Sequence, residues 1–71
     1  MSTRVRILAV ERILHMGGKV TVEEIQYQLA QKYGITADRR SIYEDMLVLE
    51  RYMPICKGWV GKKYRYWIRR G

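Results

Sequence analysis

The sequence has few residues of the types that build covalent cross-links, metal sites or membrane anchors. It contains one cysteine, Cys56, and one histidine, His15, among its 71 residues. A single cysteine excludes an internal disulfide, and a metal site needs several ligands at suitable spacing. No apolar run approaches the ~18 residues needed to span a bilayer, and arginines and a glutamate interrupt the N-terminal apolar positions, unlike a signal peptide. We therefore expect no metal, no cofactor and a cytoplasmic location, in a prokaryotic cell or at its nucleoid.

Catalytic patterns are missing as well. The chain has no Gly-rich phosphate loop and no paired-carboxylate arrangement, and its single histidine is expected on the polar face of a helix. We therefore expect that the protein is not an enzyme. Phenylalanine is also absent, and the aromatic residues are six Tyr and two Trp, whose polar tips suit the edge of a core or a binding surface.

Acidic residues are absent from the last quarter of the chain. Residues 54–71 contain six Lys and Arg and no Asp or Glu, whereas residues 35–53 contain three Arg and four acidic residues. Nearly all of the net charge of +7 therefore lies near the C-terminus. An ordinary solvated hairpin would gain nothing from so many neighbouring cations, so the pattern favours contact with a nucleic acid backbone.

Apolar spacing predicts three helices, over residues 3–16, 22–33 and 37–53. The first has a broad apolar arc, which needs cover either from two helices plus a sheet or from a dimer partner. The second begins with a capping box at Thr21–Glu24 and ends at Gly34. Its expected buried residues are Val22, Ile25, Leu29, Ala30 and Tyr33. The third is capped by Thr36 or Asp38 and buries Ile42, Met46 and Leu49 on one stripe.

The residues after Pro54 predict a β-hairpin over residues 55–69. Residues 55–57 extend, residues 58–63 turn and carry Trp59 at the tip, and residues 64–69 return with period-two alternation. Tyr64, Tyr66 and Ile68 are expected on one face, with Trp67 sealing the edge of the core. Three helices and a C-terminal hairpin, in one mainly helical domain covering residues 1–71, are the elements of a winged helix-turn-helix.

The helix at Arg39–Leu49 also carries a resemblance to a known family. Tyr33-Gly34-Ile35, followed by the block Asp38-Arg39-Arg40-Ser41-Ile42-Tyr43-Glu44-Asp45-Met46 and by Leu49, resembles the N-terminal winged helix-turn-helix of DeoR-like and WYL-domain transcription regulators. The Lys-Tyr-Arg-Tyr-Trp-Ile segment resembles the wing strand of that family. Glu44 departs from the arginine usual at its position. Because no effector-binding domain follows the wing, we expect either a small stand-alone regulator, as mobile elements often encode, or a piece of a longer one.

The resemblance implies that the third helix contacts the bases of DNA and that the wing binds beside it. The predicted function is that of a transcriptional regulator that binds double-stranded DNA sequence-specifically, with this helix in the major groove and the basic wing on the backbone or in the minor groove. The predicted DNA-binding residues are Arg39, Arg40, Ser41, Tyr43, Lys57, Trp59, Lys62, Lys63 and Arg65. Asp45 is expected to be structural and to pair with a nearby arginine.

Two alternatives remain open at the level of the sequence. Arg39 and Arg40 either contact DNA or pair as solvated charges with Asp38, Glu44 or Asp45. The whole domain is either a DNA reader or a protein-interaction winged helix, such as an antirepressor or an assembly adaptor. The apolar arc of the first helix and an exposed Trp59 favour the second reading, and the first helix or the wing offers a homodimer contact.

Overall fold

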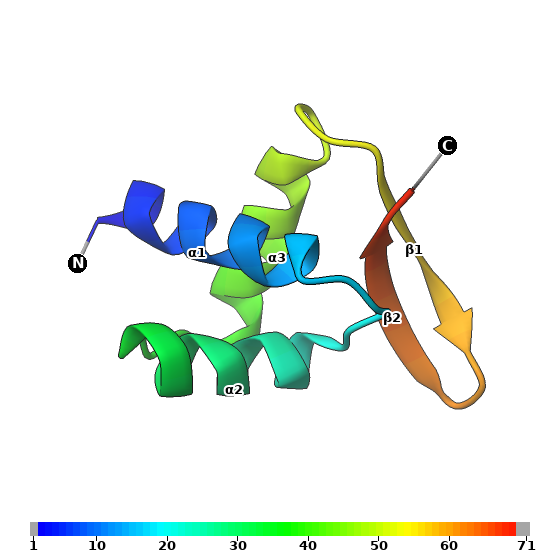
Figure 1. Cartoon of the computed structure of the whole chain (residues 1–71), viewed down its shortest axis with the longest axis horizontal. Helices are drawn as coiled ribbons and strands as arrows, with labels where there is room; N and C mark the ends of the chain where they lie inside the picture. The colour runs from blue at the N-terminus through cyan, green and yellow to red at the C-terminus, as the bar shows by residue number, and fades with distance from the viewer. Residues whose placement is uncertain (1, 70–71) are drawn as a thin grey trace.

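The computed structural model describes residues 2–69 and contains three helices followed by a two-stranded antiparallel sheet (Figure 1). The elements are α1 (Thr3–His15), α2 (Val22–Tyr33), α3 (Arg39–Leu49), β1 (Ile55–Val60) and β2 (Lys63–Ile68). In Figure 1 the helices occupy one side and the hairpin the other, with α3 crossing behind α1 and α2. The predicted mainly helical fold with a C-terminal hairpin, the layout of a winged helix-turn-helix, is confirmed.

Short-range hydrogen bonds fix where α2 and α3 begin and end. The Thr21 hydroxyl accepts from the backbone N–H of Glu24 at 3.1 Å, and the Glu24 carboxylate accepts from that of Thr21 at 2.8 Å. Gly34 closes α2 in the left-handed conformation, with φ of 65°. Asp38 then caps α3 by accepting from the backbone N–H of Ser41 at 2.8 Å. The capping box, the glycine cap and the Asp38 cap were all predicted.

The core lies where the three helices meet the inner face of the hairpin. Its buried apolar residues are Ala9, Val10, Ile13, Leu14, Val22, Ile25, Leu29, Ile35, Ile42, Met46, Leu49 and Tyr66. Helix α1 packs against α2, α3 and β2, so two helices and a strand cover it. The cover is incomplete, because Val5, Leu8 and Met16 remain exposed on the outer side of α1.

The hairpin is attached to the helices through β2. Val20 forms a β-bridge with Tyr66 on the edge of β2 that β1 leaves free, with N–H to carbonyl distances of 2.9 and 2.7 Å. The Tyr66 side chain is buried, and Tyr64 and Ile68 pack beside it against the core, as the alternation predicted. Burial raises the pKa of the Tyr66 hydroxyl to about 12.

Several predicted boundaries need correction. Helix α3 covers residues 39–49 instead of 37–53, because Asp38 is its cap and the chain tightens into turns at residues 50–52 before Pro54. Helix α1 ends at His15, one residue early. Ala30 and Tyr33 are exposed, because the buried stripe of α2 is limited to Val22, Ile25 and Leu29.

The hairpin turn is shorter than predicted. Strand β1 continues to Val60, which pairs with Lys63, so Gly61 and Lys62 alone form the connection. Gly61 has a φ of 66°, a conformation that glycine adopts without strain and that tight hairpin turns require. Trp59 therefore lies within β1, opposite Tyr64, and not in the turn. Strand β2 ends at Ile68; Arg69 follows it, and Arg70 lies outside the described residues.

The described residues contain neither a membrane-spanning helix nor a grouping of metal-ligand side chains. None of the helices within residues 2–69 combines the length and the apolar character needed to cross a bilayer. In the same residues, His, Cys, Asp and Glu nowhere gather in the groups of three that could hold a metal ion.

Candidate nucleic-acid interface

One side of α3 faces away from the core and presents charged and apolar side chains to solvent. At about 100° per residue, Arg40, Glu44 and Leu47 fall within about 60° of one another on the helix surface, and Arg51 follows in the turn directly after α3. We call these four residues the outward ridge. All four are exposed, and Leu47 is 61% exposed. The opposite side of the helix is buried and consists of Ile42, Asp45, Met46 and Leu49. The sequence assigned Arg40 to the site but left out Leu47 and Arg51, although their helical spacing already placed them beside it.

The two neighbouring arginines at the start of α3 have different environments. Arg39 forms an ion pair with Glu23 of α2 at 3.0 Å, and both side chains are more than half exposed. Arg40 is exposed and, among residues 2–69, takes part in no ion pair. None of the partners expected from the sequence holds either arginine. Arg40 is therefore the residue of the pair whose guanidinium is available to a ligand, whereas Arg39 must first exchange or share Glu23.

Ser41 and Tyr43 also occupy different positions. Ser41 is half-buried, and its backbone N–H is used by the Asp38 cap. Tyr43 is 45% exposed and faces the hairpin, where it lines a groove together with wing residues. The Asp38 cap uses only the backbone of Ser41, so DNA contact by its hydroxyl stays a prediction, and Tyr43 lies between the helix and the wing.

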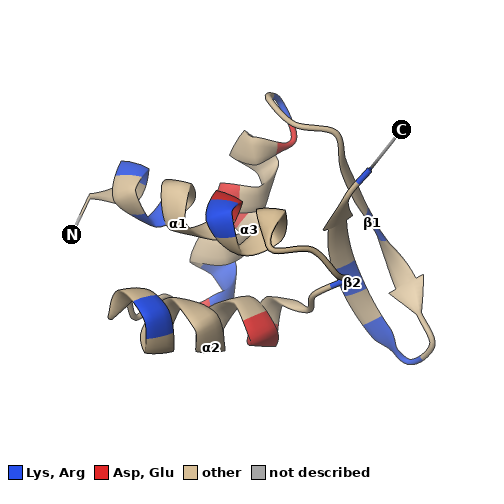
Figure 2. Cartoon of the chain, in the orientation of Figure 1, with Lys and Arg blue, Asp and Glu red and all other residues tan. Residues whose placement is uncertain are grey.

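The predicted wing residues separate into two groups. Lys57 pairs with Glu50 at 2.7 Å, and Arg65 pairs with Glu24 at 3.0 Å while also donating to the Lys19 carbonyl at 2.7 Å. These two contacts attach the hairpin to the end of α3 and to the start of α2. Lys62 and Lys63 are exposed and, within the described part of the chain, form no ion pair. Figure 2 shows Lys and Arg on both strands of the hairpin and no Asp or Glu there.

A groove of about 360 Å³ separates the hairpin from the helices. It is lined by Thr21, Val22 and Glu23 at the start of α2, by Tyr43 of α3 and by Trp59, Lys62, Lys63 and Tyr64 of the hairpin. Trp59 is 72% exposed, and its ring meets that of Tyr64 edge-on with centroids 5.5 Å apart. Trp59 thus stands over the groove and does not fold back onto α3. The groove combines three aromatic side chains with two ammonium groups that form no ion pair to any residue the structure describes.

Asp45 is the buried charge that positions α3. It is 1% exposed, and Arg6 of α1 donates to both of its carboxylate oxygens, from Nε at 2.6 Å and from a terminal nitrogen at 2.9 Å. A bidentate pair of this kind fixes orientation as well as distance. The structural role expected for Asp45 is confirmed, but its partner comes from a helix 39 positions earlier.

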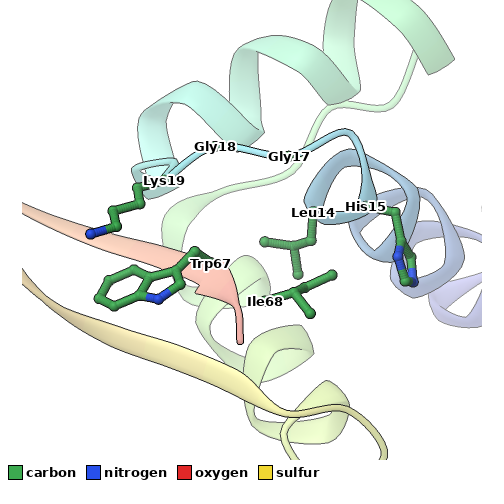
Figure 3. Close-up of a pocket in the computed structure, with 7 residues that line it drawn as sticks. All are labelled: Leu14, His15, Gly17, Gly18, Lys19, Trp67 and Ile68. Carbon is green, nitrogen blue, oxygen red and sulfur yellow. The ribbon is translucent and has the colours of Figure 1, made fainter. Parts of the chain in front are cut away.

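A second depression, of about 220 Å³, lies between the end of α1, the Gly17-Gly18 segment and β2 (Figure 3). In it the Lys19 ammonium sits over the Trp67 ring at 4.6 Å from the ring centre. Leu14 and Ile68 point toward one another beside that residue pair, and His15 lies on their far side, away from Trp67. Trp67 is half-buried and lines this depression, but it is not among the side chains that pack against the core, so its sealing of the core edge stays a prediction.

Sequence reasoning missed the two ion pairs that converge on the start of α2. Glu23 pairs with Arg39 and Glu24 pairs with Arg65, so one turn of α2 contacts both α3 and the hairpin. Acidic residues in the first turn of a helix are already favoured by the helix dipole, so their presence in the sequence does not indicate ion pairs with distant residues. A comparison of the chain with protein-family models, with curated proteins and with solved structures finds no match, so the chemistry of this surface is judged from its own residues.

Proposed function

We propose that the protein is a transcriptional regulator that binds double-stranded DNA sequence-specifically. The observation that carries the proposal is the groove between Tyr43 and the hairpin, which Lys62 and Lys63 line, together with the exposed Arg40 on α3; within residues 2–69 none of these three cations forms an ion pair. An α-helix fits the major groove of B-DNA, and lysines beside it suit the flanking phosphates. The outward ridge of α3 would enter the major groove, and the hairpin would lie on the backbone or in the minor groove. The resemblance of Arg39–Leu49 to the recognition helix of DeoR-like and WYL-domain regulators supports the same proposal.

The charge distribution supports a division of work between the two elements. Residues 35–53 carry three Arg and four acidic residues, whereas residues 54–71 carry six Lys and Arg and no acid. Helix α3 can therefore supply register and base contacts but little of the salt-dependent affinity, which falls to the wing. This function needs no catalytic group or cofactor, and it places the protein in the cytoplasm with the chromosome.

Equilibrium binding to fluorescent duplexes over a range of salt concentrations tests the proposal. R40A should cost about 1–3 kcal/mol on a selected site and blur its sequence preference. Replacing both Lys62 and Lys63 by alanine should weaken binding to all duplexes alike and reduce the salt slope by about 2. R12A and the double variant R4A/R12A, which remove exposed cations from α1, are the matched controls and should bind as the wild type does. Absence of binding to any duplex at low salt would overturn the proposal.

A second candidate function rests on α1. Val5, Leu8 and Met16 are exposed large apolar residues on one side of this helix, which suits a protein partner or a homodimer. Under this alternative the domain is an antirepressor or an assembly adaptor without specific DNA readout. A homodimer formed through α1 would instead keep the DNA-binding function and place two helices on half-sites about 34 Å apart or a multiple of that. Sedimentation of the wild type and of L8K at micromolar concentration separates the cases, because L8K dissociates a dimer formed through α1 and leaves a monomer unchanged.

A further inference from the structure

The carboxylate of Glu44 lies at the centre of the outward ridge. On the proposed function this part of α3 faces DNA, whose phosphates are negatively charged. Glu44 lies between Arg40 and Leu47 on the exposed side of α3. Arg40 precedes it by four residues, at the spacing that lets side chains pair along a helix. Even so, within residues 2–69 Glu44 belongs to no ion pair. The exposed side of α3 therefore presents a carboxylate that no ion pair within residues 2–69 neutralises.

Such a carboxylate has a narrow choice of favourable partners on DNA. Phosphates repel it, and the major-groove edges of guanine and thymine present acceptor oxygens, which repel it too. Only the exocyclic amines of cytosine and adenine donate hydrogen bonds in this groove. Adenine also presents the acceptor N7 beside its amine, which opposes the second carboxylate oxygen, whereas cytosine presents the amine alone.

We propose that Glu44 is a specificity-determining residue that accepts a hydrogen bond from the N4 amine of one cytosine and lowers affinity for sequences that lack it. The inference rests on the proposed DNA-binding function and adds a base preference to it. Residues three or four apart on a reading helix contact successive bases. The cytosine read by Glu44 therefore lies next to the base pair whose guanine Arg40 is suited to read.

Selection of bound sequences from a random duplex library with the wild type, E44Q and E11Q tests this assignment. The amide of glutamine is suited to the N6 and N7 atoms of adenine, so E44Q should replace one selected cytosine by adenine. Exchanging that cytosine for adenine should weaken wild-type binding by roughly 5- to 150-fold and should not weaken E44Q. Loss of the repulsive charge should raise the affinity of E44Q for random duplex by about two- to five-fold. E11Q removes the same charge from α1 and should select the wild-type sequence.

The outcomes separate the inference from the function on which it rests. The replaced cytosine, together with tighter binding to random duplex, would establish Glu44 as the amine reader. Sequence-specific binding by the wild type with an identical selected site for E44Q would overturn the role of Glu44 and leave DNA binding standing. No selection by the wild type would overturn both. Because Glu44 is exposed, E44Q should unfold at the wild-type temperature, and circular dichroism checks that the variant is folded.

Discussion

Replacing Arg6 by methionine leaves the buried carboxylate of Asp45 without its partner. The Arg6 side chain is 21% exposed and that of Asp45 is 2% exposed, so the two charges differ in their access to water. Stranding a buried charge costs about 3–5 kcal/mol. D45N instead leaves the Arg6 guanidinium without its carboxylate, but water reaches this guanidinium and partly hydrates it. The expected loss of stability is therefore about 1–3 kcal/mol. R6M should therefore be the more destabilising of the two variants.

The size of this effect is large for so small a protein. At about 0.05–0.15 kcal/mol per residue, a 71-residue domain has a total stability of about 4–11 kcal/mol. R6M is thus expected to leave a substantial fraction of molecules unfolded, while D45N stays folded. The double variant R6M/D45L replaces the pair by apolar side chains and should be more stable than R6M alone. Urea unfolding followed by circular dichroism measures all three free energies. A loss below about 1 kcal/mol in R6M, or a double variant no more stable than R6M, would refute the reasoning.

Three further predictions concern local structure. Hydrogen bonding to Thr21, together with the nearby Arg65, holds the pKa of the Glu24 carboxyl below its ordinary value of 4.5. The ionised Glu24 therefore contributes its full stabilisation above pH 4.5, and this stabilisation is lost as the pH falls through the lower pKa of the folded state. As the pH is lowered, the free energy of unfolding of the wild type should therefore approach that of E24Q. G34A should cost about 1 kcal/mol in a thermal melt, because φ is 65° and no atom lies within 4 Å of the added methyl group, whereas G58A, whose methyl group meets Trp67 at 3.9 Å, should be nearly neutral. The stabilisation that depends on a neutral Tyr66 hydroxyl should persist below pH 10 and be lost as the pH rises through about 12. In an absorbance titration of the tyrosines, Y66F should lack the phenolate that forms near pH 12 in the wild type.

The parts of the fold that depend on near neighbours in the chain were predictable from the sequence. Thr21 with Glu24, Gly34 and Asp38 act over three residues or fewer, and each was found in an expected role, with Asp38 rather than Thr36 as the cap of α3. The alternation in β2 likewise placed Tyr66 in the core. The end of α3 was misplaced, because Pro54 limits where a helix must stop but does not prevent it from stopping at Leu49.

The candidate site was less predictable, because its charges are distributed by tertiary packing. The partner of Asp45 depends on how α1 crosses α3, and the partner of Arg39 depends on how α2 meets α3. Lys57 and Arg65 were grouped with the other wing cations, yet acidic side chains from α2 and from the end of α3 engage both. Composition shows that cations are abundant in the wing, but only the packing shows that Lys62 and Lys63 remain unpaired within the described residues.

Nuclear magnetic resonance titration of the protein with a selected duplex tests the central claim most directly. We predict that backbone amide signals shift along the outward ridge, at Tyr43 and in the turn at Gly61 and Lys62, and that signals on the outer side of α1 around Leu8 stay in place. A titration in which the shifts gather around Leu8, or in which no signal moves at low salt, would contradict the account.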